Sequence, residues 1–144
     1  MIKQVRFADY QHEITSMMMD MLHLEPQTVD IPVERYCELD DMGVLKPFIW
    51  TDDADNEVKA VALLFISPSL RNQSIIDAST DVLWVKPEHR GNSAYFVKGI
   101  KHRLKRMGVN YWYAASRDSA PIGGFLEKNN FRPLERLYFC EVQS

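Results

Sequence analysis

The stretch from Val85 to Tyr95, VKPEHRGNSAY, joins a β-rich segment to an amphipathic helix and decides the fold predicted for this chain. Residues 74–85 before it are rich in strand formers, and Pro87 ends that run. Residues 94–107 after it repeat apolar side chains at helical spacing, and Gly108 supplies a C-cap. The pattern predicts a strand, a polar turn and a helix in succession.

The turn itself predicts an anion site. The first backbone N–H groups of a helix lack partners within the helix, and the helix dipole favours negative charge there. Arg90 adds a permanent cation, Gly91 allows close approach of a ligand to the backbone, and Asn92 and Ser93 add side-chain donors. A plain surface turn is the alternative that the residues by themselves leave open.

Patterns elsewhere predict an α/β chain. Helix 94–107 is long enough to join strands 74–85 and 109–115 as parallel neighbours. Asp9 is the expected N-cap of the first helix, and Gly43 is expected to close the second. The other expected elements are strands 3–7, 44–50, 58–67 and 134–142 and helices 10–22, 33–42 and 121–128.

Length and composition favour one globular domain spanning residues 1–144. The chain of 144 residues is 46% hydrophobic, which suits a core without disulfide or metal staples. Its longest apolar run is far shorter than the roughly 20 residues that span a bilayer, so no membrane segment is expected. Two cysteines, Cys37 and Cys140, are too few for a disulfide framework, and we expect a cytoplasmic protein.

Charge is distributed unevenly. Up to Asp81 the chain has 6 basic and 15 acidic residues, a net charge of −9, whereas the remainder has 11 and 5, a net charge of +6. Local fields concentrate partners of opposite charge. We therefore expect an anionic ligand on the C-terminal half and a cationic one near the N-terminal half, with solvated surface as the alternative.

The same stretch resembles the signature of the GNAT superfamily of N-acetyltransferases, a strand followed by V-x-P-x-x-R-G-x-G-x-G/A and a helix. A second family block, roughly A-x-x-L-Y-E-K-x-G-F, is similar to residues 122–131, IGGFLEKNNF. The resemblance implies a GNAT fold, with a mixed central sheet of six to seven strands flanked by about four helices. It also implies acetyl-CoA as co-substrate.

The resemblance places the cofactor on residues around the turn. The implied cofactor-binding residues are Leu83, Val85, Arg90, Gly91, Asn92, Ser93, Ala94, Tyr95 and Ser119. Two of them depart from the family, because Ser93 and Tyr95 stand where small residues are usual, and their side chains could crowd a pyrophosphate. Leu126 stands where the family often has a tyrosine that protonates the departing thiolate, and leucine cannot donate a proton.

The resemblance also suggests catalytic residues. Asp81 matches the position of a frequent general base, and simple alternation puts it on one strand face with Leu83 and Val85. An exposed residue at the start of the strand is the alternative for Asp81. For the missing acid we consider Tyr111, Tyr113 and Tyr138, and take Tyr138 as the candidate.

The function expected from these features is acetyl-CoA-dependent N-acetyl transfer to a small amine or a protein amino group. The alternative is a catalytically degenerate GNAT-like binding or structural protein, for example a bacteriophage component. Basic residues on helix 94–107 favour nucleic-acid binding only weakly, given the net charge of −3. The four histidines show no ligand spacing, so no metal is expected, and an exposed strand edge at 138–142 suggests a homodimer.

Overall fold

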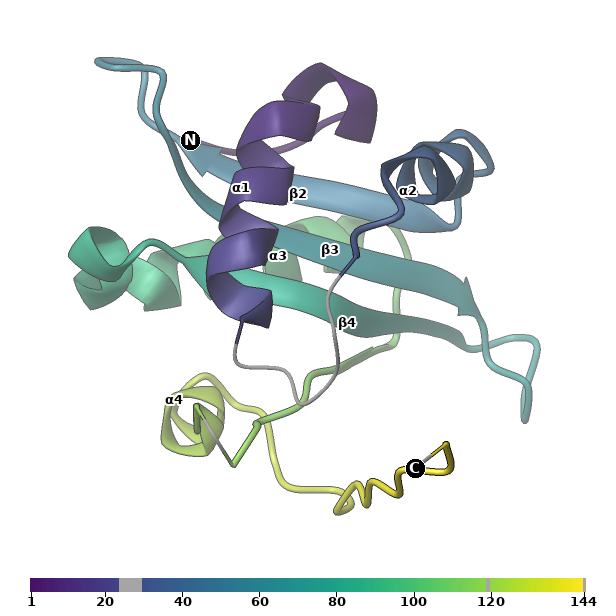
Figure 1. The fold of residues 1–144 in the computed structure, drawn as a ribbon. Coiled ribbons are helices and arrows are strands. Elements are labelled where there is room, and N and C mark those ends of the chain that lie inside the picture. Colours follow the sequence, from purple (N-terminus) through teal and green to yellow (C-terminus); the bar gives the residue numbers. More distant parts are fainter. Residues whose placement is uncertain (24–29, 119, 144) are drawn as a thin grey trace.

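The computed structural model describes residues 1–23, 30–118 and 120–143. Figure 1 shows α1 and α2 on one face of a sheet and α3 on the other. The described elements are β1 (Ile2–Gln4), η1 (Phe7–Tyr10), α1 (Gln11–Leu22), α2 (Val33–Asp41), β2 (Leu45–Thr51), β3 (Val58–Pro68), β4 (Ile76–Val85), η2 (Pro87–Asn92), α3 (Ser93–Arg106), β5 (Tyr111–Tyr113) and α4 (Gly123–Lys128), where η marks a 3₁₀ helix.

The sheet is mixed, with strand order β1-β2-β3-β4-β5. Neighbours from β1 to β4 pair antiparallel, and β5 pairs parallel to β4. Because a parallel pair needs a long crossover, the α3 helix between β4 and β5 is what permits this pairing. The predicted α/β class, the mixed sheet and the four flanking α-helices are confirmed for the described residues.

Side chains on both faces of the sheet are buried. Helices cover both faces, and this explains why β3 is a nearly continuous apolar run rather than an alternating one. The core under α3 includes Phe48, Trp50, Leu64, Phe96, Ile100 and Leu104. The core under α1 and α2 includes Phe7, Ile14, Met18, Ile49, Leu63 and Val82.

The expected strand count of six to seven is wrong, because the sheet has five strands among the described residues. Residues 134–142 were expected to form the sixth strand and instead are irregular. Leu137 and Tyr138 in this segment are 88% and 83% exposed. Strand propensity reflects packing against neighbours, and these exposed side chains have little such packing among the described residues.

The helix ends predicted at Gly43 and Gly108 are confirmed, whereas the helix start predicted at Asp9 is wrong. Gly43 and Gly108 have φ of +77° and +83°, so both occupy the left-handed conformation that closes a helix. Asp9, expected as an N-cap, lies inside η1, and the N-cap of α1 is Tyr10 without a side-chain hydrogen bond.

Among the described residues, no helix has the length and apolar character needed to cross a bilayer.

A β-bulge at Asp81 reverses the faces of β4. Pairing with β3 jumps from Leu63↔Val82 to Leu64↔Thr80, which leaves Asp81 as an extra residue. Ala78 consequently lies in the core under α3, while Val82 lies in the core under α1 and α2. The expectation that Asp81 shares a face with Leu83 and Val85 is therefore wrong. Regular alternation stops at the bulge.

Candidate functional site

Strands β4 and β5 part after a short paired segment. Only Asp77 to Ser79 of β4 pair with β5, although β4 continues to Val85. The Lys86 N–H donates to the Lys59 oxygen of β3 over 2.9 Å. Since successive backbone groups of a strand point to opposite edges, the N–H groups of Leu83 and Val85 face the opened edge. We call this opened edge, from Thr80 to Val85, the β4 gap.

Thr80 closes the narrow end of the β4 gap. Its hydroxyl donates to the Tyr113 carbonyl oxygen over 2.7 Å and accepts from the Trp112 indole N–H over 2.8 Å. These bonds tie β4 to β5 at the last paired residues. Beyond them β4 has no strand partner on this side among the described residues.

The turn after β4 is the 3₁₀ helix η2. Some of its hydrogen-bonding groups are already paired with one another within the turn. The His89 N–H donates to the Lys86 oxygen over 2.9 Å, and the Ser93 N–H donates to the Arg90 oxygen. The Ser93 hydroxyl donates to the same oxygen over 2.9 Å. Backbone donors for an anion are therefore expected mainly from the first turn of α3.

Arg90 lies against the end of β4. Its Nε donates to the Val85 carbonyl oxygen over 3.1 Å, and its guanidinium carbon is 4.6 Å from the centre of the Trp84 ring. The Arg90 side chain thus sits at the wide end of the β4 gap. It carries a positive charge where an anionic group entering the gap would pass.

Tyr95, whose ring the sequence suggested could crowd the turn, points elsewhere. Its ring lies 5.5 Å from that of Trp50, on β2, in an edge-on arrangement. Because β3 separates β2 from β4, this contact turns the ring away from the β4 gap. Gly91 borders open space, since a Cβ there would meet no atom within 4 Å. Asn92 is exposed and Ala94 is half-buried.

Asp81 faces α2. The Tyr36 hydroxyl donates to the Asp81 carboxylate over 2.6 Å. Burial, this hydrogen bond and the carboxylate charge raise the pKa of Tyr36 well above its usual value. Asp81 is exposed to solvent, as the alternative prediction for this residue expected. It lies inside the strand at the bulge, however, and not at the start of the strand.

The remaining expected site residues are not gathered here. Tyr138 is in the irregular C-terminal segment, and no hydrogen bond or ring contact among the described residues joins it to the β4 gap. Leu126 is 6% exposed on α4 and is a core residue. Ser119 lies outside the described residues.

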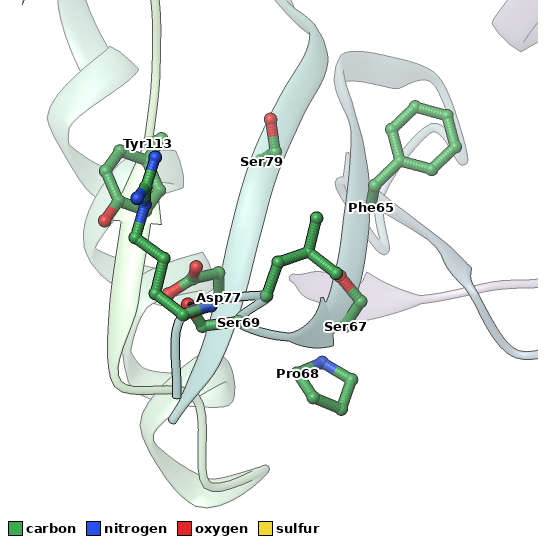
Figure 2. Close-up of a pocket in the computed structure, with 9 residues that line it drawn as sticks. Phe65, Ser67, Pro68, Ser69, Asp77, Ser79 and Tyr113 are labelled. Atoms are coloured by element: carbon green, nitrogen blue, oxygen red, sulfur yellow. Dashed lines mark hydrogen bonds between the residues drawn. The ribbon is translucent and has the colours of Figure 1, made fainter. Parts of the chain in front are cut away.

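A pocket of about 320 Å³ adjoins the narrow end of the β4 gap. It spans three strands, because Ser79 pairs with Phe65 on one side and Tyr113 on the other. Figure 2 shows labelled side chains from all three strands around it. Its lining residues are Phe65, Ser67, Pro68, Ser69, Leu70, Arg71, Asp77, Ser79 and Tyr113.

Sequence reasoning missed this pocket. Near it, β3 and β4 both change from apolar to polar residues, Ser67 and Ser69 on one chain segment and Asp77 and Ser79 on the next. That change was visible in the sequence. Its meaning depended on the register, which places Ser67 opposite Asp77.

Glu57, Glu88 and His89 form a second cluster that sequence spacing did not reveal. One ligand atom of each lies within 4.8 Å of the others. Lys86 Nζ is 3.2 Å from a Glu57 carboxylate oxygen, so a cation already sits on one of the three. This cluster is an ion-pair network at the β4 end.

The two helical layers carry opposite charge. Helices α1 and α2 together have six acidic side chains and one basic one, whereas α3 has five Lys and Arg and no acidic residue. The charge asymmetry of the sequence therefore becomes an asymmetry between the faces of the sheet. An anion is favoured beside α3 and a cation beside α1 and α2.

Comparison with solved structures shows which known fold this chain has. No model of a protein family matches the sequence, and no curated protein does. An aminoglycoside acetyltransferase from an uncultured soil metagenomic sample, in complex with sisomicin, is similar with a TM-score of 0.78 at 9% identity, over 100% of this chain and 96% of that one.

Two further acetyltransferases are similar over nearly their whole length. Glucosamine-6-phosphate N-acetyltransferase from Arabidopsis thaliana has a TM-score of 0.74 at 13% identity, over 99% of this chain and 98% of that one. A predicted acetyltransferase with acetyl-CoA from Clostridium acetobutylicum has a TM-score of 0.71 at 10% identity, over 99% and 96%. At such identities the likeness concerns the fold, and the chain has the fold of the GNAT acetyltransferases.

Proposed function

We propose that this protein is an acetyl-CoA-dependent N-acetyltransferase that acts on a small amine or a protein amino group. The observation that carries the proposal is the β4 gap, which offers the N–H groups of Leu83 and Val85 along an unpaired strand edge. The fold and the acetyl-CoA in one similar structure support it. A fold alone does not fix a function, so the residues must carry the chemistry.

Acetyl-CoA fits the gap in its chemical character. Its extended amide-containing arm matches a row of backbone donors and acceptors, and its phosphates match Arg90, the first turn of α3 and the basic residues of that helix. Acetyl-CoA supplies the acetyl thioester. The chain supplies the edge of β4 that orients acetyl-CoA and the positive charges that attract its phosphates.

Asp81 and Tyr113 are the residues we assign to proton transfer. Asp81 is solvent-exposed at the bulge and can accept the proton that the acceptor's ammonium loses. The phenol of Tyr113, in the last residue pair before the gap, can give a proton to the departing sulfur, which the exposed Tyr138 is poorly placed to do. A new C–N bond forms as the C–S bond breaks, and backbone N–H groups of β4 stabilise the negative charge on the oxygen.

Thermal unfolding with and without acetyl-CoA tests cofactor binding. A ligand at 100 times its Kd stabilises the native state by about 2.7 kcal/mol, a shift of several degrees in Tm. We expect this shift for the natural chain and for Gly91→Ala, because a Cβ there meets no atom within 4 Å. Gly91→Glu should lose it, since a carboxylate would repel the phosphates.

Turnover separates the enzyme from the alternative. Thiol release from acetyl-CoA in the presence of a broad panel of amines should exceed release without an amine. Leu126 lacks a proton to donate, and this favours a degenerate binding protein as the second candidate. Absence of both the Tm shift and thiol release would refute the transferase and leave the second candidate.

A further inference from the structure

We propose that Glu57, Glu88 and His89 form a binding site for a divalent transition-metal ion, and that Zn²⁺ is the ion that fits it best. This inference does not rest on the proposed acetyl transfer, and its test uses no acetyl-CoA. The ion would join the turn after β4 to the segment that enters β3.

The three side chains come from segments that only the tertiary structure brings together. Glu57 immediately precedes β3, whereas Glu88 and His89 lie on η2, after β4. The start of β3 and the end of β4 are neighbours, because Ala60 pairs with Val85. One ligand atom of each of the three residues lies within 4.8 Å of the others. The spacing of the histidines along the sequence, which predicted no metal, therefore could not reveal this set of donors.

His89 has a ring nitrogen that no group of the protein satisfies. Its Nε2 is inaccessible to solvent and has no hydrogen-bond partner among the described residues. A Glu57 carboxylate oxygen is 3.8 Å from this nitrogen, which is too long for a hydrogen bond. Zn²⁺ binds imidazole nitrogen and carboxylate oxygen at about 2.0–2.2 Å, so an ion between these two atoms would make an N–Zn–O angle of roughly 130°. The separation that is wrong for a hydrogen bond thus suits two ligands of one metal ion.

The carboxylates give the ion a way in from solvent. Glu88 is exposed, and the Glu57 side chain is 39% exposed, so both can rotate as the ion binds. The Glu88 carboxylate has no hydrogen bond or ion pair among the described residues. Ligand atoms of one tetrahedral ion are about 3.4 Å apart, so a shift of roughly 1 Å by this exposed carboxylate completes the set.

Lys86 competes with the ion for Glu57. Its Nζ is 3.2 Å from a Glu57 carboxylate oxygen, and its side chain is 30% exposed. The ammonium at the end of this flexible side chain can move into solvent, and a divalent ion then gains three ligands where Lys86 had one. Lys86 therefore lowers the affinity of the site for a cation without closing it.

The donor atoms select the class of metal. Imidazole is a ligand for zinc, copper, nickel and iron, whereas Mg²⁺ and Ca²⁺ prefer oxygen ligands alone. The His89 ring lies edge-on to the ring of Trp50, with 5.9 Å between their centres, and Trp50 is only 9% exposed. This packing holds the imidazole in place before an ion binds. One imidazole and two carboxylates leave a fourth position of zinc for water.

Calorimetric titration with Zn²⁺, Mg²⁺ and Ca²⁺ chlorides tests the site. The proteins are the natural chain, His89→Gln and the matched control His102→Gln, whose histidine is exposed on α3. We expect His89→Gln to weaken Zn²⁺ binding at least about tenfold, because a ligand is lost, and His102→Gln to leave it unchanged. The natural chain should bind Zn²⁺ more tightly than Mg²⁺ or Ca²⁺.

Lys86→Met completes the test and serves if His89→Gln fails to fold. It should tighten Zn²⁺ binding about threefold or more, because the competing positive charge is gone. Zn²⁺ should also raise the Tm of the natural chain and of Lys86→Met but not that of His89→Gln, since a ligand stabilises the native state that binds it. Equal Zn²⁺ affinity in the natural chain and His89→Gln, no gain in Lys86→Met, or no Zn²⁺ binding by the natural chain would overturn the proposal.

Discussion

At the residue scale, one inserted residue sets the orientation of the candidate site. The bulge at Asp81 turns its carboxylate towards α2 and Tyr36, while Leu83 and Val85 lie with the core under α3. Without the insertion, Asp81 would share their face. The candidate base and the strand edge that would bind the cofactor are thus separated by a backbone irregularity.

Replacing Tyr36 by phenylalanine tests the Tyr36–Asp81 hydrogen bond through pH. The folded-state pKa of Tyr36 is raised, chiefly by burial and then by Asp81, so its contribution to stability is present below the unfolded pKa of about 10 and is lost as pH rises through the folded value. We expect Tyr36→Phe to lower the free energy of unfolding by about 0.5–1.5 kcal/mol at neutral pH.

The measurement is the free energy of unfolding of both proteins in denaturant at neutral and strongly alkaline pH. The difference between them should shrink at alkaline pH as the natural phenol ionises. A difference that stays constant or grows with pH would show that the Tyr36 phenol does not have this environment. Spectroscopic titration gives a second check, because the variant should lack the phenol whose pKa is raised well above its usual value.

At the element scale, α3 depends on a close approach to β1. A Cβ placed on Gly99 would lie 2.3 Å from Cδ1 of Ile2 and 3.4 Å from its Cβ. The absence of a side chain at Gly99 therefore lets the helix lie flat on the sheet edge.

Gly99→Leu should destabilise the protein by about 1–3 kcal/mol through overpacking. The cost should fall in the double variant Gly99→Leu with Ile2→Ala, because the two residues share the space. Gly124→Ala on α4 is the matched control, since its Cβ would meet no atom within 4 Å, and it should be neutral or slightly stabilising. Thermal unfolding measures all of them, and equal stability of Gly99→Leu and the control would contradict this packing.

At the scale of the whole molecule, the C-terminal segment leaves apolar surface uncovered. Figure 1 shows it, in yellow, beside α4 and off the sheet. Leu134, Leu137, Phe139 and Val142 are between 67% and 88% exposed. Apolar surface gathered in this way is typical of an interaction site.

We expect the protein to self-associate through this segment by its exposed apolar side chains, because the strand edge from which the sequence suggested a homodimer is not formed. Sedimentation should give a mass above the 16.8 kDa of one chain at high concentration. Replacing Leu137 and Phe139 together by serine should return a single-chain mass without lowering the Tm, because both side chains are exposed. A single-chain mass at every concentration would contradict the expectation.

Much of the fold could be predicted because its signals are local. Helical spacing in α3, the glycines that close α2 and α3, and the polar turn between β2 and β3 each act within a few residues. The strand, turn and helix around Arg90 follow from the same kind of signal. So does the parallel pairing of β4 and β5, since α3 leaves few other connections.

What the amino-acid sequence determined by itself, then, was the class of fold, the order of most elements and the chemical character of the turn after β4. The tertiary structure alone decided the bulge at Asp81, the irregular 134–142 segment, the turning of Tyr95 towards Trp50 and the pocket around Asp77. The physical reason is that each of these depends on which residue lies opposite which. Strand register and burial are set by contacts between segments distant in sequence, and no local pattern encodes them.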